Sequence, residues 1–259
     1  MSWQSGGASV RGAQHQRLGL PVQDAIGWRQ LPQGVALAVA DGHGSAASSR
    51  SDVGARLAVD TALDLLASIA SDPAAASPDD LARALVDTWR AAVRSHAAQH
   101  PLTPEPASLF PVYGTTVLAA LATGQDLLLL QLGDGDLLLV SSASHVRRAW
   151  PRDARLLGGE TTSLCMPEAW RELRIARRPL TVDPPALIIL CTDGYSNSFR
   201  TERGFLRVGR DILSMVRAHG IQQVERDLGV WLEEASRLGS GDDSTAGLLY
   251  REAEALTTA

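Results

Sequence analysis

Two apolar runs in this chain end in the same dipeptide, and this feature constrains the fold more than any other. Residues 35–40 (VALAVA) lead directly into Asp41-Gly42, and residues 186–191 (ALIILC) lead through one threonine into Asp193-Gly194. Short apolar runs bounded by turn residues predict buried strands. The glycine after each aspartate permits a sharp turn and lets a backbone carbonyl approach a ligand closely. For either copy alone an ordinary Asp-Gly turn is the simpler interpretation, whereas two such tips side by side would form an oxygen-only pocket suited to Mg²⁺ or Mn²⁺.

Composition excludes several classes of protein. The chain has 259 residues, 45% of them hydrophobic, and a net charge of -5. A single domain over residues 1–259 can bury a full core at this size, and the negative charge argues against a nucleic-acid-binding protein. No apolar stretch reaches the length of a membrane span, and the N-terminus lacks the regions of a signal peptide. We therefore expect a cytoplasmic protein with no membrane contact.

Lysine is absent, and all 24 basic residues are arginine. This excludes Schiff-base lysine chemistry and the P-loop ATPases that need a phosphate-binding lysine. Cys165 and Cys191 suit structural thiols rather than a disulfide framework or a sulfur-based metal site. His96 and His100 have a spacing that could ligate a metal, but no acid or further histidine lies near them in sequence, so we expect a solvated helix end.

Strand and helix patterns occur in blocks. Residues 25–31 and 35–40 predict a hairpin, which is followed by a helix over residues 46–70 and a second helix that begins at the Ser77 cap. Further strands are expected at residues 114–122, 125–132, 136–142, 186–191 and 246–250, and further helices at 209–218 and 221–237. Residues 133–135 predict a tight hairpin, and residues 145–178 an irregular stretch whose eight arginines form solvated faces or a surface for a phosphorylated partner. This order indicates an α+β protein with antiparallel sheets covered by helices.

Other short motifs stand at the remaining predicted strand ends. Asp24 directly precedes the first hairpin, and Gly241-Asp-Asp-Ser-Thr245 precedes the last strand. Gly114-Thr-Thr116 and Gly133-Asp134-Gly135 lie between them. Together with Asp41-Gly-His-Gly44 and Asp193-Gly194, this order resembles the type 2C protein phosphatases, a family of metal-dependent serine/threonine phosphatases. The resemblance covers about residues 9–250 and is closest to a divergent bacterial branch of that family.

The resemblance implies a fold, a reaction and a set of partners. The fold would be a four-layer α-β-β-α sandwich of two antiparallel sheets flanked by helix pairs, with the active site at one end. Two Mn²⁺ or Mg²⁺ ions would bind the phosphate oxygens and acidify the attacking water. The substrate would be phosphoserine or phosphothreonine in a protein, the reaction would oppose a serine/threonine kinase, and we expect a monomer.

The resemblance also implies the metal ligands. Asp41 would bridge the two ions, and the Gly42 carbonyl would bind one of them. Asp193 and Asp242 would complete the other, because carboxylates fix a hard cation and leave positions open for water. Asp24 would act on the metal shell directly or through water.

Other positions match the family or depart from it. His43 matches the residue that protonates the leaving oxygen, a role that suits a pKa near neutrality. Asp134 would support a third ion or only shape its turn. Gln23 stands where many members have glutamate, and Arg17, with His15 beside it, is the nearest candidate for a phosphate-binding arginine. These departures leave two alternatives open: an inactive pseudophosphatase that binds phosphoproteins, and a hydrolase of a small phosphorylated metabolite.

Overall fold

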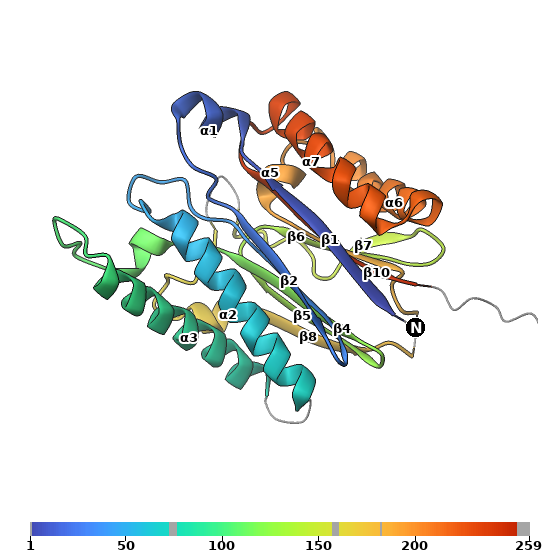
Figure 1. The fold of residues 1–259 in the computed structure, drawn as a ribbon, viewed down its shortest axis with the longest axis horizontal. Coiled ribbons are helices and arrows are strands. Elements are labelled where there is room, and N and C mark those ends of the chain that lie inside the picture. The colour runs from blue at the N-terminus through green and yellow to red at the C-terminus, as the bar shows by residue number, and fades with distance from the viewer. Residues whose placement is uncertain (1, 73–76, 157–160, 182, 253–259) are drawn as a thin grey trace, which may run out of the picture.

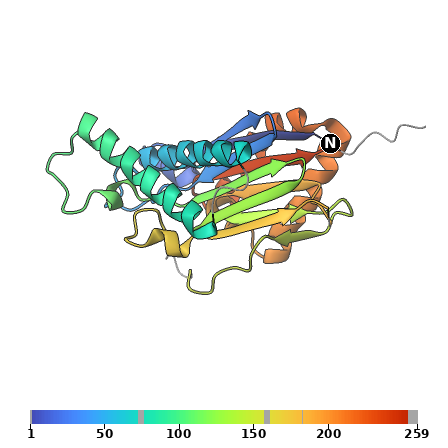
Figure 2. The same ribbon diagram turned by 90° about the horizontal axis from the view of Figure 1, so that it is seen from below.

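Two five-stranded antiparallel sheets pack face to face in the computed structural model, which describes residues 2–72, 77–156, 161–181 and 183–252. Helices α2 (Ser51–Ser71) and α3 (Pro78–Gln99) cover one sheet, and helices α6 (Glu202–His219) and α7 (Ile221–Leu238) cover the other (Figure 1). The two helix pairs lie on opposite sides of the sheets, and Figure 2 shows the same arrangement turned by 90°. The expected α+β four-layer sandwich is confirmed.

The first sheet has the order β2-β3-β4-β5-β8. Its strands are β2 (Ala25–Leu31), β3 (Gly34–Ala40), β4 (Val117–Thr123), β5 (Asp126–Leu132) and β8 (Arg174–Pro179). The predicted β2–β3 hairpin is present. Alternate residues of β3 face opposite layers, since Leu37 joins the core between the sheets while Ala36 and Ala38 join the core under α2 and α3. Burial on both faces explains why this strand is apolar throughout.

The second sheet has the order β1-β10-β9-β6-β7. Its strands are β1 (Trp3–Val10), β10 (Ser244–Arg251), β9 (Leu187–Cys191), β6 (Asp136–Val140) and β7 (Val146–Arg148). The N-terminal segment before residue 25 is polar, and the sequence analysis assigned no strand or helix to it. It contains β1 and the short helix α1 (Ala13–Leu18). Strand β1 carries few apolar residues and pairs along its whole length with β10, so its stability comes from a partner at the other end of the chain.

The predicted hairpin around residues 133–135 is also wrong. Strand β5 pairs with β4 and β8, whereas β6 pairs with β7 and β9, so residues 133–135 carry the chain from one sheet to the other. Gly133 has a φ of 103°, which favours glycine. Both strands are runs of buried leucine. Such runs do not reveal which neighbours a strand pairs with, because both of its faces are covered.

Three further expectations need correction. Residues 145–178 are not irregular throughout, because they contain β7, helix α4 (Ala169–Glu172) and β8. Helix α6 begins at Glu202 rather than near residue 209, since the Thr201 side chain accepts a hydrogen bond from the Gly204 amide and caps it. Helix α2 begins at Ser51 rather than near residue 46. Among the described residues, no helix combines the length and the apolarity needed to cross a membrane.

Helices α2 and α3 are joined by a buried tryptophan. Ser77 caps α3 in a reciprocal capping box with Asp80, as the sequence predicts for the cap. The apolar face of α3 packs against α2, and Trp89 on this face is fully buried. Its indole Nε1 donates a hydrogen bond to the Gly54 carbonyl of α2 at 3.0 Å. The tryptophan therefore contributes both apolar burial and a satisfied polar group.

Trp89→Ala is expected to lower the free energy of unfolding by about 3–5 kcal/mol, because it leaves a large cavity between α2 and α3. The matched control is Trp28→Ala on β2, where the side chain is 39% exposed. The control should cost no more than about 1 kcal/mol. Urea denaturation measures both losses, and equal losses would contradict this account of the helix pair.

Candidate active site

Four aspartates from both sheets meet at the ends of strands. Asp24 precedes β2 and Asp41 follows β3, while Asp242 lies just before β10 and Asp193 opens the short helix α5 (Asp193–Ser196) after β9. The pKa of the Asp41 carboxyl is raised well above its ordinary value, first by burial and then by the negative charges of the other three. The structure therefore brings these predicted site residues within electrostatic reach of one another.

Asp41 and Asp193 are in direct contact. Each carboxyl group acts directly on the pKa of the other, because this contact raises the pKa of Asp41 and lowers that of Asp193. Burial raises the pKa of Asp193 to about 6, and the nearby charges of Asp134 and Asp242 add to the effect. Two carboxyl groups in direct contact share a proton when no cation lies between them, because two adjacent negative charges shielded from water repel strongly.

Asp24 is buried and held by hydroxyl groups from the second sheet. Thr192 and Thr245 both donate to its Oδ2, at 2.8 and 2.7 Å. Burial still raises the pKa of Asp24 well above its ordinary value, although the two hydrogen bonds oppose the shift. Because both bonds go to one oxygen, the hydroxyl groups orient the carboxylate and leave Oδ1 outside these contacts.

The backbone after Asp41 is fixed by the start of the Gly-Thr-Thr strand. The Asp41 carbonyl accepts from the Thr116 amide at 2.9 Å and from the Thr115 hydroxyl at 2.8 Å. The His43 amide donates to the Gly114 carbonyl at 3.0 Å. None of these bonds uses the Gly42 carbonyl oxygen. A Cβ on Gly42 would lie 2.5 Å from the Gln23 carbonyl oxygen, so only glycine fits at this position.

His43 packs against Gly114, where an added Cβ would lie 2.4 Å from the imidazole Cδ2. Burial lowers the pKa of His43, and the negative charge of Asp134 opposes this shift. Asp134 accepts a hydrogen bond from the Thr161 hydroxyl at 2.8 Å. The charge of Asp134 acts on both His43 and Asp193, so it lies within electrostatic reach of both.

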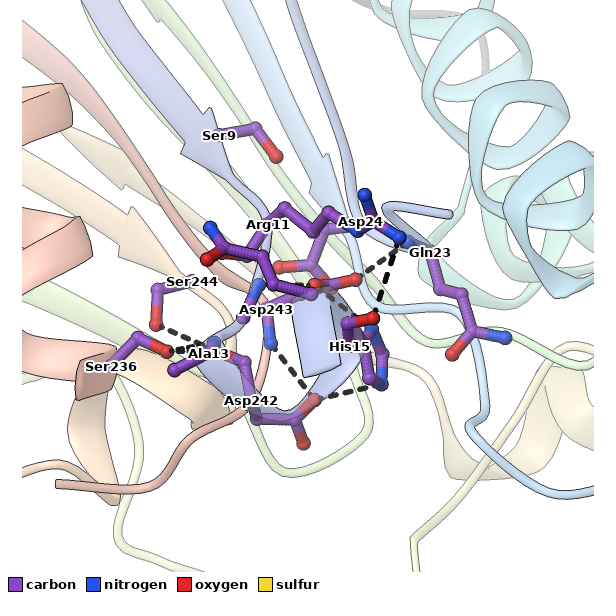
Figure 3. A network of polar contacts seen from close by, with 12 residues as sticks. Ser9, Arg11, Ala13, His15, Gln23, Asp24, Ser236, Asp242, Asp243 and Ser244 are labelled. Carbon is purple, nitrogen blue, oxygen red and sulfur yellow. Dashed lines mark hydrogen bonds and ion pairs between the residues drawn. The ribbon is translucent and has the colours of Figure 1, made fainter. Parts of the chain in front are cut away.

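The two aspartates before β10 have different environments. The side chain of Asp242 is 56% exposed, whereas that of Asp243 is 2% exposed. Asp243 accepts hydrogen bonds from the backbone amides of Gly12 and Gln23, both at 2.6 Å (Figure 3). Sequence analysis did not single out Asp243. Its only signal was its place beside Asp242, because its partners lie more than 200 positions away in the chain.

The predicted phosphate-binding residues point in different directions. Arg17 is exposed on the last turn of α1. His15 is buried and faces Asp242 and Asp243. Gln23 donates from its side chain to the Ser51 hydroxyl at 2.9 Å, at the first residue of α2. Arg11, which the sequence analysis missed, lies at the end of β1 and donates to the His15 carbonyl at 3.4 Å.

A cavity of about 440 Å³ opens beside Asp134 and Asp193. Three arginines also line it, namely Arg148, Arg152 and Arg174. Arg148 forms ion pairs with the buried Asp136 and with Glu202. The cavity gives a substrate room beside the carboxylates, and cationic groups face it.

His96 and His100 form no metal site with other described residues. Their ring centroids are 4.6 Å apart. His96 Nδ1 lies 3.0 Å from the Tyr113 hydroxyl. His100 is exposed at the end of α3.

The chemistry of the aspartate cluster fits a hard divalent cation. Its donors are all oxygen atoms, which Mg²⁺ and Mn²⁺ prefer. Within the described part of the chain, no three His, Cys, Asp or Glu side chains are grouped closely enough to hold a metal ion by themselves. An open arrangement suits Mg²⁺, which keeps several waters and takes one or two carboxylates. Burial also raises the pKa of Asp24, Asp41 and Asp193, so a bound cation would relieve an unfavourable concentration of negative charge.

Comparisons with known proteins identify the class. Residues 11–233 match the family described as "Protein phosphatase 2C". The fold is similar to that of the catalytic domain of the serine/threonine protein phosphatase PstP in complex with 2 manganese ions (22% identity, 96% of this chain and 97% of that chain, TM-score 0.62). It is also similar to the Mycobacterium tuberculosis phosphatase PstP/Ppp (19%, 98% and 100%, TM-score 0.62). A third similar structure is PppA, a regulatory component of the T6SS in Pseudomonas aeruginosa (19%, 96% and 98%, TM-score 0.60). Comparison with curated protein sequences gives no match.

The chain belongs to the protein phosphatase 2C family, because the match covers most of its length. Its class is therefore that of the metal-dependent protein serine/threonine phosphatases, as the sequence predicts. The solved structures, at these low identities, show the shared fold.

Asp193→Asn tests the electrostatic cost of the cluster in metal-free protein. The pKa of Asp193 is raised from 3.8 to about 6 in the folded state, so the folded state binds this proton more tightly than the unfolded chain does. The contribution of the Asp193 carboxyl group to the free energy of unfolding is therefore fully present below about pH 4 and is lost as the pH rises through about 6. We expect the variant to melt on the order of 5 °C above the wild type near pH 7.5. Below about pH 4 the two should melt together.

Thermal unfolding of metal-stripped protein measures this difference. The control is Asp64→Asn, which neutralises an aspartate that is 70% exposed on α2 and should show no such pH dependence. A variant that melts below the wild type near pH 7.5 would contradict the assigned repulsion.

Proposed function

We propose that this chain hydrolyses phosphoserine and phosphothreonine in proteins, with two Mn²⁺ or Mg²⁺ ions as cofactors, and that it opposes a protein kinase. The observation that supports the proposal is the cluster of Asp24, Asp41, Asp193 and Asp242 at the ends of strands from both sheets, where burial and neighbouring negative charges raise the pKa of Asp24, Asp41 and Asp193. When bound, the ions would supply Lewis acidity toward the phosphate oxygens and toward the attacking water.

The residues have separate roles in this proposal. Asp41 would hold both ions, and the Gly42 carbonyl would hold one of them, which its freedom from the neighbouring backbone bonds supports. Asp193 and Asp242 would hold the other ion. Asp24, oriented by two hydroxyl groups, acts on the metal shell directly or through water.

His43 and Asp134 complete the proposed machinery. His43 donates the proton to the leaving serine or threonine oxygen, since burial lowers its pKa and so makes it a readier proton donor. Asp134 supports a third ion or holds the turn at residues 133–135 through Thr161. A protein substrate reaches the carboxylates from the cavity lined by arginines.

The proposal extends to the form and setting of the protein. Residues 1–259 would act as a single catalytic domain, as a monomer in the cytoplasm. The pseudophosphatase alternative rested on Gln23 and on the lack of a phosphate-binding arginine at the spacing usual in the family. The Gln23 side chain bonds to Ser51, and no described residue favours that alternative.

Turnover of p-nitrophenyl phosphate and of a phosphothreonine peptide should require Mn²⁺ and stop with a chelator. Asp41→Asn and Asp193→Asn should each lower turnover by at least about 100-fold, because removing one carboxylate weakens metal binding and transition-state stabilisation. Asp64→Asn is the matched control and should leave turnover unchanged. Activity that survives the chelator would exclude the mechanism, and tight phosphopeptide binding without turnover would favour the pseudophosphatase.

His43→Ala tests the proton donor through the leaving group. A phosphoserine peptide leaves as a basic alkoxide and needs the proton, whereas p-nitrophenolate leaves without one. The variant should lose about 10²–10⁴-fold in turnover of the peptide and much less with p-nitrophenyl phosphate. The pH–rate profile for the peptide should also lose its alkaline limb. Equal losses with both substrates would rule out the acid role.

A further inference from the structure

Asp242 differs from the other clustered aspartates in its exposure. Its side chain is 56% exposed, whereas Asp24 is buried and Asp41 is half-buried at the strand ends. An exposed aspartate samples several rotamers and must be restrained before it can hold a cation at a defined place. The contacts that restrain Asp242 therefore decide how well it can act as a ligand.

The backbone of Asp242 is clamped on two sides by glycines. A Cβ on Gly12 would lie 2.3 Å from the Asp242 carbonyl carbon, and a Cβ on Gly194 would lie 2.0 Å from the Asp243 carbonyl oxygen. The Ser236 hydroxyl, from α7, donates to the Asp242 carbonyl oxygen at 2.8 Å. This peptide is thus fixed by three segments: the loop between β1 and α1, the start of α5 and the end of α7.

One oxygen of the Asp242 carboxylate is restrained by its neighbours. The Asp243 amide donates to Oδ1 at 2.9 Å, and His15 Nε2 lies 3.6 Å from the same oxygen. Neither of these contacts involves Oδ2. The same division occurs at Asp24, where both hydroxyl groups bind one oxygen. A carboxylate held by one oxygen presents the other in a defined direction.

The imidazole of His15 is itself held by Asp243. His15 Nδ1 lies 2.9 Å from Asp243 Oδ1, an ion-pair contact that is too poorly aligned to count as a hydrogen bond. Asp243 is anchored in turn by the amides of Gly12 and Gln23. Figure 3 shows the ring between the two aspartates, with one nitrogen toward each.

We propose that His15 and Asp243 are positioning residues that orient Asp242 toward the metal centre. The inference rests on the proposed function, because it takes Asp242 as a metal ligand. It replaces the expectation that His15 binds phosphate. A phosphate at the His15 ring would meet two carboxylates, and the ring is only 11% exposed.

Three variants of His15 separate the two ring nitrogens. His15→Gln keeps a donor near the Nε2 position that faces Asp242, His15→Asn keeps one near Nδ1 that faces Asp243, and His15→Leu keeps neither. Calorimetric titration of the metal-stripped full chain with Mn²⁺ gives the dissociation constant for each. We expect His15→Leu and His15→Asn to bind Mn²⁺ about 10–100-fold more weakly than the wild type, and His15→Gln to retain most of the affinity.

Further readouts distinguish positioning from packing and from phosphate contact. The melting temperature of each metal-free variant monitors folding. At saturating Mn²⁺ the KM for a phosphothreonine peptide should stay near that of the wild type. Equal weakening in all three variants would assign a packing role and overturn the proposal. A raised KM with an unchanged Mn²⁺ dissociation constant would overturn it in favour of phosphate contact.

The wild type and Asp41→Asn separate this inference from the proposed function. One outcome would overturn only the positioning role: the wild type binds Mn²⁺, Asp41→Asn does not, and His15→Leu binds Mn²⁺ with the same affinity as the wild type. A wild type that binds no Mn²⁺ would overturn both. Asp64→Asn serves as the control and should bind Mn²⁺ as the wild type does.

Discussion

Asp24, Asp41 and Asp193 are held within electrostatic reach of one another in largely buried surroundings, and the repulsion between them constrains the rest of the structure. Each carboxyl group loses hydration on burial, and the negative charges of neighbouring aspartates add to the cost of ionising it. The surrounding fold must offset this cost. It does so with buried apolar strands in both sheets, such as β3 and β9, and with specific donors, such as Thr192 and Thr245 at Asp24. A bound cation would turn the same repulsion into attraction, which links the stability of this end of the protein to its proposed cofactor.

The repulsion is possible only because both sheets contribute to one site. Strands β2 and β3 position Asp24 and Asp41, while β9 and β10 position Asp193 and Asp242. The core between the sheets joins alternate side chains of β3, β4, β5, β6, β9 and β10, so the two sets of strand ends cannot shift independently. Close packing at Gly42 and Gly194 leaves no room for a side chain where the loops meet. Precision at the site therefore depends on packing far from the carboxylates.

Sequence patterns predicted what is local and failed where distant segments meet. The apolar runs before Asp41 and Asp193, the helix pairs and the Ser77 cap are local, and the structure contains them. The order of the motifs also identified the family. Strand β1 was missed because its pairing with β10 joins residues from opposite ends of the chain. The change of sheet at residues 133–135 was missed because leucine runs do not encode partners. At the site, the placement of His15 between Asp242 and Asp243 has no local signal, since it depends on how α1 folds back onto the start of β10.

The central claim is that the aspartate cluster holds divalent metal ions. Crystals of the protein grown with Mn²⁺, with diffraction recorded at the manganese absorption edge, test it most directly. The account predicts two anomalous peaks, both beside Asp41, with Asp193 and Asp242 in contact with one of them. Anomalous peaks elsewhere on the protein, or density at the cluster explained by water alone at saturating Mn²⁺, would contradict it.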